Sequence, residues 1–197
     1  MKGFIELNAW TGHYLYDEGF KLIKDKVVVN GRIGLWIGEA STSEDGFNIS
    51  QEQLNAYLFL VRQQHGIRQA ILESLKKEFP NFLANDHASR DQDEDNFPGI
   101  SDLSPTSDLK DHIGPETISI NDDTKDGAAY VTWNFRCRWD IEHGFEVITH
   151  NDRVIDIAPN VDTWKIYKDN GTYDEEQRKY SEQEWTLPKK KKWWHFW

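Results

Sequence analysis

The sequence contains almost nothing that would place the protein outside a reducing compartment. It has one cysteine in 197 residues, so an intrachain disulfide cannot form. Residues Met1–Leu7 hold no apolar run of the kind found in signal peptides. No window of the chain approaches the roughly 20 apolar residues of a membrane span. We therefore expect a cytoplasmic protein that is not integral to a membrane.

Basic residues are also scarce, and their scarcity is local. The net charge is −11, with 23 Lys and Arg against 34 Asp and Glu. Between Asp86 and Asp126 there are twelve acidic and three basic residues, a local charge of −9, which leaves −2 for the remaining chain. Such a field disfavours a nucleic-acid binder and favours a protein partner with a basic surface.

Aromatic residues are abundant by comparison. Nine Trp, ten Phe and seven Tyr can fill a core, although the hydrophobic fraction is only 38%. The length fits one domain over residues 1–159 followed by an appendage over residues 160–197. The appendage ends in the basic and aromatic tail Lys189–Trp197. We expect this tail to dock on the protein or on a partner, with contact to an anionic membrane left open.

The strongest structural pattern lies between Tyr130 and Ile157. Alternate positions are apolar and the positions between them are polar, which predicts a strand with one buried face; the apolar positions are Val131, Trp133, Phe135, Cys137 and Trp139. Phe145–His150 and Arg153–Ile157 follow as two further strands joined at a tight Asn-Asp turn. This region is predicted to form a three-stranded meander.

The remaining elements define the fold class. The runs Lys26–Asn30 and Arg32–Ile37 are separated by Asn30-Gly31, the dipeptide typical of a β-hairpin. Ser50 and Gln53 form a capping box that begins a helix, which we expect to bend or end at Gly66. A second helical run is expected to stop at Pro80. The sequence thus predicts an α+β fold, mainly antiparallel, with a C-terminal meander, an N-terminal hairpin and a helical pair on one face of the sheet.

The turn after the central strand concentrates reactive residue types; they are Trp139, Asp140, Glu142, His143 and Gly144. Cys137 could act as a thiol nucleophile with His143 as its base. However, Cys137 shares the apolar face of its strand, so we interpret it as an inert core residue. Asp140, Glu142 and His143 could form half of a metal site. We favour a structural role in which they cap strand ends, and the metal site stays an alternative.

An acidic loop precedes the meander. Its spacing Asp91-x-Asp93-x-Asp95, with Asp102 at the twelfth position, resembles a calcium loop, but Asn96 stands where such loops need glycine. We interpret the loop as a protein-binding segment, with calcium left open. The predicted partner-binding residues are Asp91, Asp93, Glu94, Asp95 and Asp102. No catalytic residue, metal or cofactor is predicted.

Several motifs resemble one known family. They are Gln53-x-x-Ala56-Tyr57, Pro98-x-Ile100, Ala129-Tyr130, the signature Cys137-x-Trp139-Asp140-x-Glu142-His143-Gly144, and Arg153-Val154. Over about Gly31–Ile157 the chain resembles a bacterial family of uncharacterised domains related to immunity-type proteins of polymorphic toxin systems. The resemblance implies a protein that neutralises a toxin by binding it. It brings no catalytic mechanism.

Two alternatives compete with this non-enzymatic binding function. One is a metal-dependent hydrolase centred on Asp140, Glu142 and His143, for which a bound transition metal would be decisive. The other is a structural adaptor that associates with itself through its aromatic tail. We expect the binding function, with a basic protein such as a toxin as the partner and the oligomeric state undetermined.

Overall fold

The computed structural model describes residues 1–15, 27–38, 49–86, 106–140 and 143–186. The chain divides into two compact units, Met1–Asp162 and a second unit that begins at Thr163. The second unit contains helices α2 (Trp164–Asn170) and α3 (Tyr173–Thr186). Within the described ranges, no helix has both the length and the apolar composition needed to cross a membrane.

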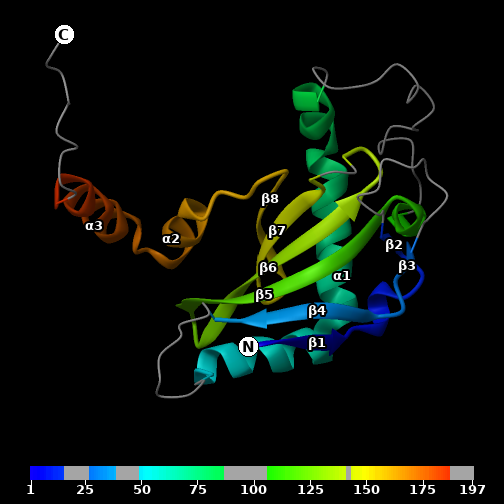
Figure 1. Ribbon diagram of the computed structural model, residues 1–197, viewed down its shortest axis with the longest axis horizontal. Coiled ribbons are helices and arrows are strands. Elements are labelled where there is room, and N and C mark those ends of the chain that lie inside the picture. Colours follow the sequence, from blue (N-terminus) through cyan, green and yellow to red (C-terminus); the bar gives the residue numbers. More distant parts are fainter. Residues whose placement is uncertain (16–26, 39–48, 87–105, 141–142, 187–197) are drawn as a thin grey trace, which may run out of the picture. The chain divides into compact units, whose positions relative to one another are not determined.

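A six-stranded sheet forms the centre of the first unit, in the order β1-β4-β5-β6-β7-β8 (Figure 1). Its strands are β1 (Lys2–Glu6), β4 (Arg32–Ile37), β5 (Ile113–Lys125), β6 (Ala128–Cys137), β7 (Phe145–His150) and β8 (Arg153–Ala158). Neighbours are antiparallel except β4 and β5, which are parallel because the long helix α1 connects them. The predicted α+β, mostly antiparallel fold is confirmed.

The C-terminal meander is also confirmed. Strands β6, β7 and β8 pair in sequence, and the turn between β7 and β8 places Asn151 in the left-handed region with φ +56°. Along β6 the predicted alternation is present, since Trp133, Phe135 and Cys137 are buried and the residues between them are partly exposed. The apolar period of two therefore sets which face of β6 lies in the core.

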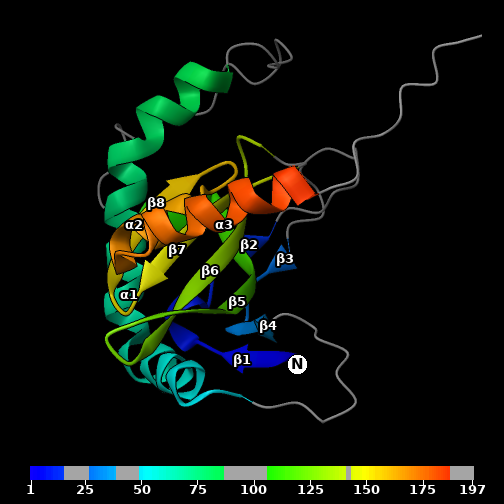
Figure 2. The ribbon, with the colours of Figure 1, turned by 90° about the vertical axis from the view of Figure 1, so that its left-hand side faces the viewer.

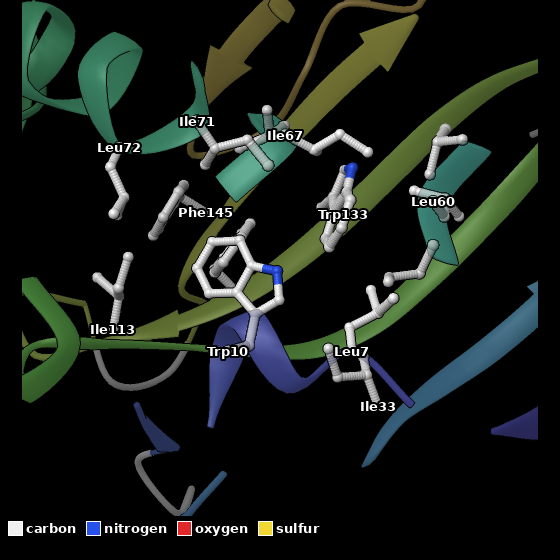
Figure 3. Close-up of a cluster of buried hydrophobic side chains, with 14 of the residues drawn as sticks. Leu7, Trp10, Ile33, Leu60, Ile67, Ile71, Leu72, Ile113, Trp133 and Phe145 are labelled. Carbon is white, nitrogen blue, oxygen red and sulfur yellow. The ribbon is translucent and has the colours of Figure 1, made fainter. Parts of the chain in front are cut away.

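The single helix α1 (Gln51–Asp86) covers one face of this sheet (Figures 1 and 2). It contributes a buried apolar stripe to the core, which consists of Ala56, Leu60, Ile67, Ile71, Leu72, Leu75 and Phe79. The short 3₁₀ helix η1 (Asn8–Trp10) places Trp10 in the same core. Figure 3 shows Trp10 among side chains from α1 and from the sheet. The Trp10 ring lies 5.9 Å from Trp133 and 5.2 Å from Phe135.

The predicted helical pair is present as two helical segments joined across a bend within α1. The bend lies at Gln63, whose φ and ψ are −111° and 18°, and Gly66 does not end the helix. The adjacent Gln64 side chain donates a hydrogen bond to the Val61 carbonyl (3.0 Å) and accepts one from the Ala9 N–H (2.8 Å). A side chain that donates a hydrogen bond to a backbone carbonyl of its own helix competes with the helical hydrogen bonds, and such competition is a known cause of kinks.

Pro80 does not stop the helix, contrary to the prediction. Proline removes one backbone donor and disfavours a helix interior, yet α1 continues through Pro80 to Asp86. Pro80 is exposed, so water can satisfy the carbonyl that loses its partner. The neighbouring Phe79 is fully buried and holds this part of the helix against the core.

The N-terminal strands form antiparallel pairs as predicted, but the two strands on either side of Asn30-Gly31 do not pair with each other. Arg32–Ile37 pairs with β1, whereas β3 (Val27–Val28) pairs with β2 (Tyr14–Leu15) in a separate two-stranded sheet. Gly31 has a left-handed backbone with φ +86°. Its carbonyl accepts a hydrogen bond from the Leu7 N–H at 2.7 Å. A dipeptide that tolerates left-handed backbone thus links two sheets.

His13 and Arg68 form a polar pair in which His13 is buried and Arg68 is partly exposed. The Arg68 Nε–H donates to His13 Nε2 (3.1 Å), which requires that the Nδ1–H of His13 donate to the Ile113 carbonyl (3.2 Å). The pKa of His13 is lowered to about 4, mainly because the ring is buried and also because of the positive charges of Arg68 and Lys110, while the bond to Ile113 opposes the shift. His13 is therefore neutral in the folded protein at neutral pH.

This neutral histidine makes the folding stability depend on pH. The folded pKa of about 4 lies below the ordinary value of 6.5, so between these pH values the unfolded chain binds a proton that the folded chain does not. The free energy of unfolding should fall by up to about 3 kcal/mol as the pH drops through this window. Urea unfolding of the wild type and of His13→Asn checks it.

The His13→Asn variant should lose this part of the pH dependence, and its stability curve should be flatter than that of the wild type between pH 6.5 and 4. His65→Asn is the matched control, because His65 is exposed on α1 and its replacement should leave the wild-type slope. Parallel curves for the wild type and His13→Asn would show that the buried histidine does not set the pH dependence.

Candidate functional site

The turn after β6 is stabilised by its own polar groups. The Asp140 carboxylate accepts the His143 N–H at 2.8 Å and contacts His143 Nδ1 at 3.2 Å, while the Asp140 carbonyl accepts the Gly144 N–H at 3.0 Å. The Cys137 Sγ lies 3.4 Å from the same carbonyl. These bonds satisfy backbone groups that would otherwise be unpaired between β6 and β7.

Gly144 is the residue that the turn requires most strictly. Its φ of +71° lies in the left-handed region, and a Cβ on it would overlap the carbonyl oxygen of Phe135 on β6. Only glycine avoids both the unfavourable dihedral and this overlap. The glycine of the signature therefore has a structural explanation in the approach of β7 to β6.

The first residue of the signature turn, Trp139, belongs to the core. It is 8% exposed, stacks on Phe145 with ring centroids 5.6 Å apart, and meets Phe79 of α1 edge-on at 5.0 Å. Cys137 is fully buried on the same face of β6. The interpretation of this thiol as a core residue is confirmed, since an inaccessible thiol cannot act as a nucleophile.

The opposite face of β6, which α1 does not cover, carries polar residues tied to β5. Asn121 Nδ2 donates to Thr132 Oγ1 (3.2 Å), and Asn134 Nδ2 donates to Thr117 Oγ1 (3.0 Å). Arg136 holds Glu116 through two contacts, Nε to Oε2 at 3.0 Å and Nη2 to Oε1 at 3.3 Å. Cross-strand pairs of this kind stabilise the sheet and orient the charges of its open face.

An open hollow of about 330 Å³ lies on this face. Its lining residues come from β4, β5, β6 and the signature turn, and they are Trp36, Glu116, Thr117, Ser119, Asn134, Phe135, Arg136 and His143. The Glu116 side chain is 44% exposed and that of Arg136 is 13% exposed. The hollow thus offers hydroxyl, amide and ion-paired groups beside an exposed indole, a set suited to contact with a polar partner surface.

The structure brings only part of the predicted site together. Asp140, His143 and Gly144 lie in one turn, and His143 borders the hollow. Glu142 and the predicted partner-binding residues fall outside the described residues; the latter are Asp91, Asp93, Glu94, Asp95 and Asp102. Among the residues that are described, no group of three or more His, Cys, Asp and Glu is arranged to hold a metal ion.

The hollow itself was not predicted from the sequence. The polar positions of β6, Asn134 and Arg136, were recognised as a solvent-facing side of the strand, which is the only signal that pointed toward it. Trp36 and Glu116 belong to other strands, and nothing in the sequence indicates that the parallel pairing of β4 and β5 brings them beside β6.

These features define a class of α+β domain with a bent helix on one sheet face, an open polar face on the other, and a glycine-dependent turn between two central strands. The chain belongs to the family described as Domain of unknown function (DUF6985), whose model matches residues 6–164. The match covers the other five strands of the central sheet completely but includes only Glu6 of β1. No curated protein and no solved structure matches the chain.

The structural role of the signature glycine can be tested against a second left-handed glycine. Gly144→Ala combines a left-handed alanine with overlap on Phe135, whereas Gly127 (φ +78°) has no atom within 4 Å of the position that a Cβ would take. Gly127→Ala should lower the free energy of unfolding by about 1 kcal/mol. Gly144→Ala should lower it by about 3 kcal/mol or more, since backbone must also shift. Equal losses in urea unfolding would show that the overlap costs nothing.

Proposed function

We propose that the protein is a non-enzymatic protein-binding domain that captures a partner with a basic surface, and that it serves as an immunity-type protein that neutralises a toxin. The observation that carries the proposal is the separation of charge. Residues 86–126 hold −9 of the net charge of −11. A field concentrated in one segment raises the association rate and the selectivity for a basic partner.

The described end of this acidic segment supports a surface role. Asp111, Glu116, Asp122 and Asp126 are all exposed, on η4 (Thr106–Asp111), on β5 and in the turn after it. Exposed carboxylates keep much of their hydration even where they have a partner in the protein, as Glu116 has in Arg136 and Asp122 has in Gln53. Strand β5 also contributes to the open face of the sheet, where the hollow presents hydroxyl and amide groups to a partner.

The immunity part of the proposal rests on the resemblance of the signature region, Cys137 to Gly144, to domains related to immunity-type proteins. An immunity protein acts by occupying its toxin, so it needs a complementary surface and no catalytic group. The signature turn fits this requirement, because Asp140 and Gly144 are explained by the folding of the turn. A cytoplasmic location would match such a role.

Neutralising the acidic loop should slow capture of the partner. The acidic-loop variant carries D91N, D93N, E94Q and D95N, and the control carries D174N, E175Q, E176Q and E182Q on α3. The association rate with a basic partner protein should fall about tenfold at low salt for the first variant and much less for the control. The two proteins should converge at high salt because ions screen the field. Stopped-flow fluorescence measures both rates.

Two results would contradict the proposal. Equal association rates for the acidic-loop variant and the control would show that net charge alone, and not this segment, attracts the partner. A transition metal retained in stoichiometric amount by the purified protein, and lost in a variant without the Asp140 and His143 side chains, would instead support the metal-dependent hydrolase.

A further inference from the structure

The free edge of strand β1 is an open hydrogen-bonding site. β1 lies at one end of the six-stranded sheet and pairs only with β4 (Figure 1). The Met1 amino group donates to the Ile37 carbonyl (3.0 Å), the Ile37 N–H donates to Met1 (3.1 Å), and the Leu7 N–H donates to Gly31 (2.7 Å). Odd-numbered residues therefore direct their backbone groups toward β4.

By the alternation of an antiparallel ladder, Lys2, Phe4 and Glu6 direct their N–H and C=O groups away from the sheet. Across the described part of the chain, no hydrogen bond to these outward backbone groups is present. An edge of this kind is a template for another strand. Each of the three residues can exchange two hydrogen bonds with a residue opposite it.

An apolar flank of helix α1 lies along the same edge. Leu54, Tyr57 and Val61 are spaced i, i+3 and i+7, so they share one side of the helix. Just past the bend at Gln63, Gln64 accepts the N–H of Ala9 in η1, the element that follows β1. Asn55, on the other side, donates to Gly127 in the β5–β6 turn (2.8 Å). The apolar side therefore faces β1 and not the centre of the sheet.

This flank is exposed although it is apolar. Leu54 and Val61 are 42% and 37% exposed, and Tyr57 is partly buried against the core. Gly3 of β1 would direct a side chain to the helix side of the sheet, and no atom lies within 4 Å of the position that its Cβ would take. A strand added to β1 would place alternate side chains over this flank and into the space beside Gly3, where they would leave water.

The residues of β1 on the open face of the sheet determine which side chains would suit the added strand on that face. Lys2, Phe4 and Glu6 point to this face, with Lys2 Nζ 4.0 Å from the Trp36 ring and the Arg32 guanidinium 3.9 Å from the Phe4 ring. Phe4 is 62% exposed. An acidic residue opposite Lys2, an aromatic one opposite Phe4 and a basic one opposite Glu6 would complement them.

The geometry points to β1 as the docking site of an extended segment of the partner protein, which adds an antiparallel strand with apolar residues opposite Gly3 and Ile5. This inference rests on the proposed binding function and names the form of the partner. Two copies of β1 paired antiparallel about Phe4 would also set Glu6 opposite Lys2, so a dimer through this edge is the alternative occupant and its detection would overturn the inference.

A synthetic peptide, Thr-Lys-Val-Tyr-Val-Glu-Thr, is the probe for this site. Aligned antiparallel to β1, it places Lys opposite Glu6, Tyr opposite Phe4 and Glu opposite Lys2. NMR titration of the full chain should show binding, with the largest changes at the amides of Phe4 and Glu6. N-methylation of the peptide Tyr, whose N–H faces β1, should weaken binding about tenfold or more, which corresponds to loss of its ladder bonds. N-methylation of the second Val, whose N–H points away, should have little effect.

Protein variants test the same edge. Phe4→Pro removes an outward N–H that β4 does not use, so β1 remains paired while the peptide should bind about tenfold more weakly. Phe4→Ala keeps that N–H and should bind more tightly than Phe4→Pro. Leu54→Lys with Val61→Lys should also weaken binding, whereas the control Gln51→Lys with Gln69→Lys, which adds the same charge at other exposed positions of α1, should not.

Three outcomes would overturn the inference. They are equal binding of the two N-methylated peptides, peptide shifts confined to the hollow around Trp36 and His143, and a dimer in sedimentation that Phe4→Pro dissociates. The acidic-loop variant separates this inference from the proposed function, because it should bind the peptide like the wild type. Capture of the basic partner without any effect of Phe4→Pro would remove the edge site and leave the binding function intact.

Discussion

The burial of one face of β6 is the constraint on which the rest of the structure depends. Trp133 and Phe135 of this strand pack with Trp10 from the N-terminal 3₁₀ helix, and Phe145 and Trp139 extend the same aromatic cluster to Phe79 of α1. The Trp133 indole donates to Thr149 Oγ1 on β7 at 3.0 Å, so its polar atom is satisfied inside the core. Because side chains alternate along a strand, burying this face leaves the polar face of β6 open and assigns each neighbouring strand its exposed residues.

Much of the fold could be predicted because its signals are local. The alternation along β6, the Asn-Asp turn and the capping box at Ser50 and Gln53 each act within a few residues, and the capping box is present with both of its hydrogen bonds, at 3.0 and 3.1 Å. The pairing of β1 with β4 and the parallel pairing of β4 with β5 join residues far apart in sequence, and no local pattern encodes them. The bend at Gln63 lies next to Gln64, which accepts the Ala9 N–H, and a contact between residues so far apart in sequence cannot be read from a local pattern.

The candidate site shows the same division. The signature turn was recognised as a unit, and its glycine and aspartate are accounted for by the backbone geometry that they permit and stabilise. The hollow on the open face and the edge of β1 were not foreseen, because each arises where strands from distant parts of the sequence meet or fail to meet a neighbour. An open edge, an apolar helix flank beside it and a concentrated negative charge are three separate features that favour a binding role for this family member.

Hydrogen exchange of the backbone amides, with and without a basic partner protein, tests this account most directly. Outward amides of an unpaired edge exchange readily and become protected when a strand is added. The account predicts slower exchange in the complex at Phe4 and Glu6 and within residues 86–126, with no change in the signature turn at His143 and Gly144. Protection confined to that turn, with β1 and the acidic segment unaffected, would contradict it.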